Sequence, residues 1–163
     1  MPANDLMRRN VAILAICLAL MMSATSLVII TSALVGVILA PNRVWATVPL
    51  ACMFIGSLSC AFPASFLMKR IGRRAGFSVG LVFALIGAVI ATLGLLERSF
   101  FLFCVGSLLI GLFNGFGQFY RFAAADVASE AYRSRAISWV LAGGVVAAFV
   151  GPNLANWSQH LIV

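Results

Sequence analysis

Long stretches without charged residues constrain this chain more than any other feature. No Asp, Glu, Lys or Arg occurs in five segments, which are 10–42, 44–68, 75–96, 99–120 and 136–159. An α-helix rises about 1.5 Å per residue, so each segment is long enough to cross a hydrocarbon layer of about 30 Å. A surface helix of a soluble domain needs a polar face toward water, and these segments do not supply one. The sequence therefore predicts an all-α fold, a polytopic transmembrane helix bundle.

The apolar segments predict the positions of the helices. We expect one transmembrane bundle over residues 1–163, with helices at about 11–40, 45–68, 75–96, 100–121 and 136–159. Arg8 and Arg9 precede the first apolar run, as they would in a signal peptide. That run continues to Ala40, far beyond the roughly 7–15 apolar residues of a signal peptide. We therefore interpret it as a retained first membrane helix.

The basic residues divide unequally between the two sides of this predicted bundle. One side holds nine cations, which are Arg8, Arg9, Lys69, Arg70, Arg73, Arg74, Arg121, Arg133 and Arg135. The other side holds only Arg43 and Arg98. Cytoplasmic loops of membrane proteins carry the excess of Lys and Arg. The asymmetry predicts a cytoplasmic N-terminus, an external C-terminus and a place in a plasma membrane, the inner membrane of a bacterium, with the lipid bilayer as partner.

Several classes of function are disfavoured by composition. The net charge of +7 lies in the breaks between apolar segments and forms no basic face with interleaved aromatic residues, so nucleic acid is not an expected partner. The four cysteines lie inside apolar segments without a C-x-x-C pair, and His160 is the only histidine. We expect no metal site, no cofactor and no enzymatic activity, because no cluster of acids, bases or ligands is present.

The break between the second and third predicted helices carries a recognisable motif. It reads Ser65-Phe66-Leu67-Met68-Lys69-Arg70-Ile71-Gly72-Arg73-Arg74. This resembles the signature loop of the major facilitator superfamily, roughly G-x-L-x-D-R-x-G-R-R/K. The resemblance implies a conformational role for Lys69, Arg70, Gly72, Arg73 and Arg74. Lys69 stands where the family has an aspartate, so one charge of the signature loop is reversed here. The alternative is a basic loop that only fixes topology.

Two further predicted helices bear on this resemblance. Residues 144–155 resemble its glycine-proline helix, in which Gly151 and Pro152 would permit a bend. The alternative for this helix is a packing kink without transport. In the fourth predicted helix, Ser107 stands where some proton-linked members have an arginine. Proton antiport through that position is therefore not expected.

Polar residues inside the predicted helices are candidates for lining a substrate pathway. Polar groups are costly in lipid and tend to face the bundle interior. The candidates are Thr25, Ser32, Ser107, Asn114 and Gln118. Ser107, Asn114 and Gln118 share one stripe of the predicted helix 100–121. Each candidate has an alternative role, either in hydrogen bonds between helices or in bonds to its own backbone.

The resemblance implies the N-terminal portion of a transporter that works by alternating access. Family members usually have twelve helices in two halves, and five are predicted here. We therefore expect an incomplete N-terminal half, with a missing C-terminal half or self-association as partner and a small-molecule substrate that the sequence does not identify. The alternative is a non-transporting multi-pass scaffold or assembly partner from a truncated gene.

Overall fold

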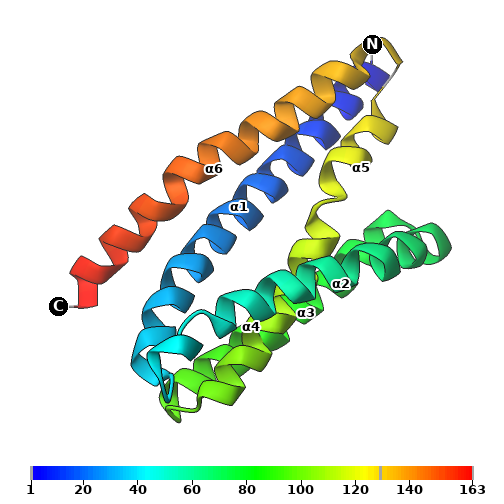
Figure 1. The fold of residues 1–163 in the computed structure, drawn as a ribbon. Coiled ribbons are helices and arrows are strands. Elements are labelled where there is room, and N and C mark those ends of the chain that lie inside the picture. The colour runs from blue at the N-terminus through cyan, green and yellow to red at the C-terminus, as the bar shows by residue number, and fades with distance from the viewer. Residues whose placement is uncertain (1, 129, 163) are drawn as a thin grey trace. The chain divides into compact units, whose positions relative to one another are not determined.

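The computed structural model consists of helices joined by short turns (Figure 1). It describes the backbone of residues 2–128 and 130–162, and the side chains of 7–128, 130, 132–147 and 153. The elements in order are α1 Pro2–Leu39, η1 Arg43–Trp45, α2 Val48–Ile71, α3 Arg73–Leu96, α4 Phe100–Gly117, α5 Tyr120–Val127, η2 Glu130–Tyr132 and α6 Arg133–Ile162. No β-strand occurs among the described residues, so the all-α prediction is confirmed.

The largest difference from the expected helices lies in the segment predicted at 100–121. Here α4 ends at Gly117, residues 118–119 form a turn, and α5 begins at Tyr120. Glycine costs a helix about 1 kcal/mol relative to alanine, and Gly115 and Gly117 both lie in the last turn of α4. Hydropathy alone does not register this break, because no charged residue accompanies it.

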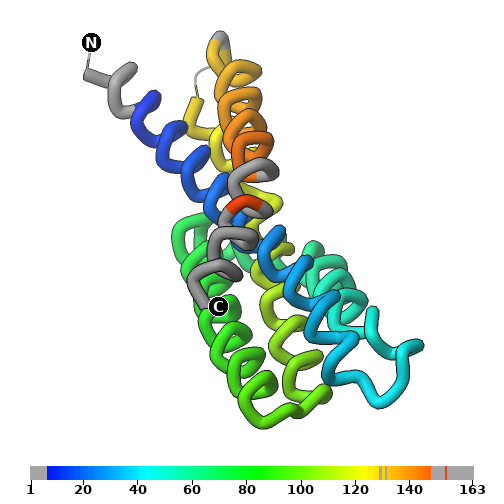
Figure 2. Tube along the Cα trace, turned by 90° about the vertical axis from the view of Figure 1, so that its left-hand side faces the viewer, coloured from blue at the N-terminus to red at the C-terminus, as the bar shows by residue number. Residues whose placement is uncertain are grey.

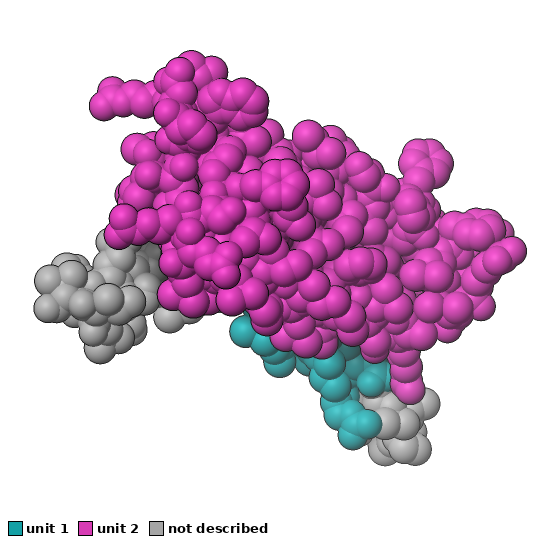
Figure 3. Space-filling view, turned by 90° about the horizontal axis from the view of Figure 1, so that it is seen from below, with its two compact units in different colours: residues 1–27, 118–163 teal, residues 28–117 magenta. Residues whose placement is uncertain are grey.

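The described residues form two compact units, coloured separately in Figure 3. Unit 1 comprises residues 1–27 and 118–163, and unit 2 comprises residues 28–117. Unit 2 contains the end of α1 and the whole of α2, α3 and α4. Unit 1 contains the beginning of α1 together with α5, η2 and α6.

Helix α4 is the central element of unit 2, because α2 and α3 both pack against it (Figures 1 and 2). The two flanking helices contact each other much less. On the α2 side, a Cβ atom added at Gly111 would collide with the carbonyl oxygen of Met53, and one added at Gly56 would collide with that of Leu108. The backbones of α2 and α4 therefore approach so closely that no side chain fits between them.

The second face of α4 packs against α3 in the same manner. A Cβ added at Gly106 would lie 2.5 Å from the backbone nitrogen of Ala91. One added at Gly87 would lie 2.9 Å from the carbonyl oxygen of Gly106. Without a hydrophobic driving force between helices in lipid, such close van der Waals packing is a main source of association. Within unit 2, α2, α3 and α4 are thus joined by close backbone contact.

Two tight turns connect the helices of unit 2. Gly72 alone separates α2 from α3, with φ +84° and ψ 158°. The turn from α3 to α4 contains Arg98 at φ +52°. Both turns are too short for anything but antiparallel neighbours.

In unit 1 the first half of α1 packs against α6. A Cβ added at Gly143 would lie 2.9 Å from the carbonyl oxygen of Ala15, and one at Gly144 would lie 3.9 Å from Cδ2 of Leu18. Helix α5 also packs on α6. Between these two helices, Arg133 lies 3.8 Å from Asp126, with both side chains about half exposed. An exposed ion pair of this kind contributes about 0–1 kcal/mol.

The described helices have the length and composition of membrane spans. Four candidate spans are Met7–Leu39, Arg43–Ile71, Arg73–Leu96 and Phe100–Val127. Large apolar side chains point away from the packed interfaces, among them Phe62, which is 90% exposed, and Phe101, which is 75% exposed. Exposure of such residues in water would be costly, whereas lipid solvates them. The chain is a multi-pass membrane protein.

Candidate functional site

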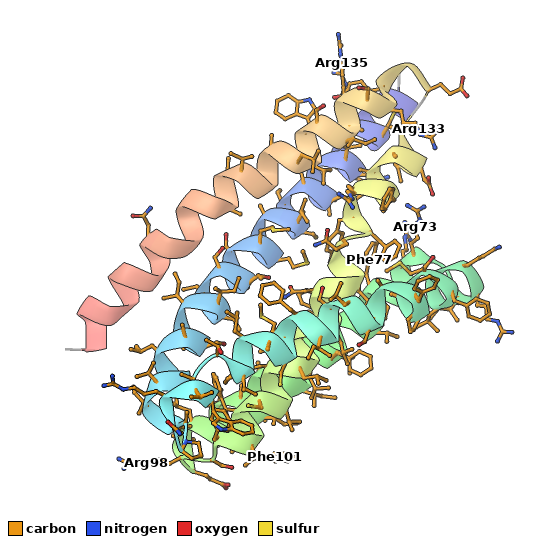
Figure 4. All side chains as sticks on the ribbon, viewed as in Figure 1. Arg73, Phe77, Arg98, Phe101, Arg133 and Arg135 are labelled. Atoms are coloured by element: carbon orange, nitrogen blue, oxygen red, sulfur yellow. The ribbon has the colours of Figure 1, made fainter. Side chains whose placement is uncertain are left out.

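The basic turn of residues 69–74 is built by the end of α2 and the beginning of α3. Lys69, Arg70 and Arg74 have exposed side chains, and Arg73 is half-buried. The guanidinium carbon of Arg70 lies 4.9 Å from the ring centroid of Phe66, a cation–π contact one helical turn away. Figure 4 shows Arg73 and Phe77 one turn apart on α3. The conformational role implied for this turn stays a prediction.

The conformation of Gly72 explains the glycine in this turn. A φ of +84° with a ψ of 158° lies in a region that is open essentially to glycine alone. A Cβ at this position would meet no atom within 4 Å, so space is not the constraint. The glycine is therefore required by the backbone dihedral angles.

The polar positions of α4 lie on a buried face. Ser107 is 1% exposed and Asn114 is 7% exposed, and Gly111 lies between them on the same face. The Ser107 hydroxyl donates a hydrogen bond of 2.9 Å to the carbonyl of Phe103, one turn back in the same helix. Gln118 lies beyond the end of α4, in unit 1, and is exposed. The stripe expected from a continuous helix is therefore interrupted after Asn114.

The two candidates on α1 differ in their surroundings. The Thr25 hydroxyl donates to the carbonyl of Met21 at 2.8 Å, which is the bond to its own helix that threonine often makes. Ser32 is fully buried, and its hydroxyl oxygen has no hydrogen-bond partner among the described residues. A buried hydroxyl without a partner costs about 1–3 kcal/mol. Ser32 is therefore the candidate whose hydroxyl could still form a hydrogen bond with another group.

The candidates do not all fall in one place. Ser32, Ser107, Asn114 and the basic turn belong to unit 2, whereas Thr25 and Gln118 belong to unit 1. Gly151 and Pro152 lie within α6, and the bend expected there stays a prediction. Among the described residues, no group of three His, Cys, Asp or Glu side chains is placed to hold a metal ion.

Sequence reasoning missed two local features of unit 2. Pro63 lies inside α2, where it removes the backbone donor that would bond the carbonyl of Ser59. At the other end of the unit, a depression is lined by Ile38, Leu39, Leu95 and Arg98. The proline could have been found in the printed sequence, because it interrupts an apolar helical segment. The depression depends on packing and has no sequence signal.

The helices are apolar, they pack through backbone contacts at glycines, and they bury a few polar side chains. These features are typical of a helical membrane protein. Comparison with known proteins specifies the family. The family model described as "Sugar (and other) transporter" matches residues 18–161. The chain belongs to this family of major facilitator superfamily transporters, as the motif in residues 65–74 implied.

The chain is also similar to individual transporters of other bacteria. The riboflavin transporter RfnT of Brucella anthropi is 40% identical over 155 residues, which cover 95% of this chain and 39% of RfnT. The uncharacterized MFS-type transporter YddS of Bacillus subtilis is 32% identical over 126 residues, covering 75% of this chain and 29% of YddS. This chain thus spans well under half the length of either relative. No solved structure matches it.

Proposed function

We propose that this chain is part of a plasma-membrane secondary transporter that moves a small neutral solute by alternating access, and that riboflavin is the first solute to test. The observation that carries the proposal is the 40% identity to RfnT over 95% of this chain. Alternating access requires two helix bundles that rock around one site. Helices α2, α3 and α4 would belong to one of these bundles and would move together as a rigid body. The rest of the transporter would supply the second bundle.

The polar groups buried in unit 2 support a neutral solute. Ser32, Ser107 and Asn114 carry hydroxyl and amide groups, and the apolar segments contain no charged residue. A charged solute would need a compensating charge inside the membrane. Riboflavin is an uncharged molecule with hydroxyl groups and a ring that presents amide-like donors and acceptors, which suits such groups.

A chimera tests the proposal. The chain is joined to the part of RfnT that its alignment leaves uncovered and is produced in a bacterium that needs external riboflavin. Saturable uptake of radiolabelled riboflavin is expected for the chimera and not for the 163-residue chain alone. Absence of uptake by a chimera that reaches the membrane, in parallel with active RfnT, would count against riboflavin. Saturable uptake by the chain alone would contradict the proposed need for a second bundle.

A pair of variants tests the role of the buried polar groups. Asn114→Ala in the chimera is expected to lower uptake at least ten-fold at unchanged membrane abundance, if Asn114 contacts solute. The matched control is Ser78→Ala, because Ser78 is exposed and its hydroxyl bonds only one turn back, to the carbonyl of Arg74. Equal uptake by both variants would remove Asn114 from the proposed pathway.

A further inference from the structure

One exposed row of α2 ends in a positive charge. Leu58, Phe62, Phe66 and Arg70 follow each other at four-residue steps and therefore lie along one side of the helix. Leu58, Phe62 and Phe66 are 76%, 90% and 61% exposed. The Arg70 guanidinium lies over the Phe66 ring at 4.9 Å. An apolar strip about three turns long thus leads directly to a cation.

Two more exposed cations are close to Arg70 in the sequence. Lys69 is its neighbour in the last turn of α2, and Arg74 follows in the first turn of α3, across the single residue Gly72. The surface at Gly72 is open, since a Cβ there would meet no atom within 4 Å. The only acidic residue of unit 2 is Glu97, at the opposite end of α3. Unit 2 therefore has no carboxylate near Gly72 that could neutralise Lys69, Arg70 and Arg74.

The combination matches the chemistry of one kind of ligand. A phosphodiester headgroup needs several donors of positive charge at the membrane surface, and its acyl chain needs an apolar strip just below them. Free phosphate would use the cations and leave the strip unexplained. We propose that Lys69, Arg70 and Arg74 form a binding site for the headgroup of an anionic phospholipid such as phosphatidylglycerol, whose acyl chain lies along Phe66 and Phe62.

The expected selectivity follows from charge. Attraction of one Lys or Arg to an anionic membrane surface is equivalent to about a five-fold change in binding. Removing all three cations should therefore weaken phosphatidylglycerol binding at least ten-fold. Binding of phosphatidylcholine, which has no net charge, should not change.

Native mass spectrometry of the purified 163-residue chain tests this selectivity. Phosphatidylglycerol or phosphatidylcholine is titrated against the wild type, the triple variant Lys69→Gln, Arg70→Gln, Arg74→Gln, and a control triple variant. The control is Arg8→Gln, Arg9→Gln, Arg135→Gln, which removes the same charge from exposed positions of unit 1. Preferential phosphatidylglycerol binding should be lost in the first triple variant and kept in the control. Equal loss in both variants, or no preference in the wild type, would overturn the proposal.

A second measurement leaves all cations in place, so it does not depend on the folding of the triple variant. Tryptophan is placed at position 66 or, as the control, at 101, after Trp45, Trp139 and Trp157 are replaced by Phe. Phe101 is 75% exposed at the opposite end of unit 2, near Arg98 (Figure 4). The proteins are placed in phosphatidylcholine vesicles with increasing amounts of brominated phosphatidylglycerol. Half-quenching at position 66 should occur at a mole fraction at least three-fold lower than at position 101.

Two outcomes of the quenching experiment would contradict a bound lipid. Identical quenching curves at 66 and 101 would mean that both positions sense only bulk lipid. Reversal of the preference at 66 by millimolar inorganic phosphate would mean that the cations bind phosphate in general, without a contribution from the acyl chain.

Discussion

At the scale of single residues, glycine serves two separate purposes in unit 2. Gly72 provides backbone dihedral angles that other residues adopt only with strain, whereas Gly111 and Gly56 provide space for a neighbouring backbone. The two purposes respond differently to substitution. A methyl group at Gly72 meets no atom, but a methyl group at Gly111 meets a carbonyl oxygen.

Gly72→Ala and Gly72→Leu should therefore destabilise the protein to a similar degree. The strain at this φ and ψ is about 1–3 kcal/mol and does not depend on side-chain size. The melting temperature in detergent should fall by about 2–4 °C for each kcal/mol. Gly144→Ala is the control, since its Cβ would only reach ordinary van der Waals contact with Leu18 at 3.9 Å. A much larger loss with Leu than with Ala would contradict the explanation by backbone strain.

Gly111→Ala should be more damaging than Gly76→Ala. At Gly111 the obstacle is the backbone of Met53, which cannot move without shifting α2. At Gly76 the nearest atom is Cγ of the flexible Met68 side chain, at 2.5 Å, which can adopt another rotamer. Overpacking costs about 1–3 kcal/mol when side chains can adjust, and more is expected at Gly111. Thermal unfolding of both variants measures the order, and equal melting temperatures would contradict it.

Residue-level predictions from the sequence were partly successful. The motif at 65–74 led to the correct family, yet the reason for Gly72 required the dihedral angles. Thr25 and Ser32 were both candidates for lining a pathway, but Thr25 bonds to its own helix and Ser32 is buried without a hydrogen-bond partner among the described residues. Hydrogen-bond partners depend on packing, which a single sequence does not contain.

At the scale of elements, hydropathy found the apolar helices and missed their interruptions. The turn at 118–119 lies inside a segment without charges, so apolar length alone predicts one helix. The central place of α4 was also not predicted. In the structure, one glycine face of α4, at Gly111, contacts α2, and a second face, at Gly106, contacts α3. Which neighbour each face contacts is a tertiary property.

Pro63 gives α2 an interruption that can be tested. Its missing N–H leaves the carbonyl of Ser59 without the usual helical donor. Pro63→Ala should restore this bond and raise the melting temperature by several degrees, because Pro63 is exposed and its removal leaves no cavity. Pro41→Ala, in an exposed turn outside the helices, should have little effect. A lower melting temperature for Pro63→Ala would mean that the proline supports the native shape of α2.

At the scale of the whole molecule, the unequal distribution of cations still predicts the orientation. Asn10 and Arg73 should face the cytoplasm, and Asn42 and Ser99 the outside. The four native cysteines, Cys17, Cys52, Cys60 and Cys104, are first replaced. Single cysteines at the four test positions are then exposed to a membrane-impermeant maleimide on intact cells. Labelling is expected only at 42 and 99, and labelling at 73 from outside would invert the proposed topology.

The central place of α4 also bears on the order in which the chain assembles. Ribosomes produce α2 and α3 before α4, and α2 and α3 share little surface with each other. The hairpin they form would therefore enter the bilayer without a stable mutual interface. Helix α4 is synthesised directly after them and carries the two faces that pack against α2 and α3. Assembly of unit 2 is thus expected to be a late, concerted step: biosynthetic intermediates that stop before Phe100 should be loose hairpins that chaperones and membrane proteases recognise.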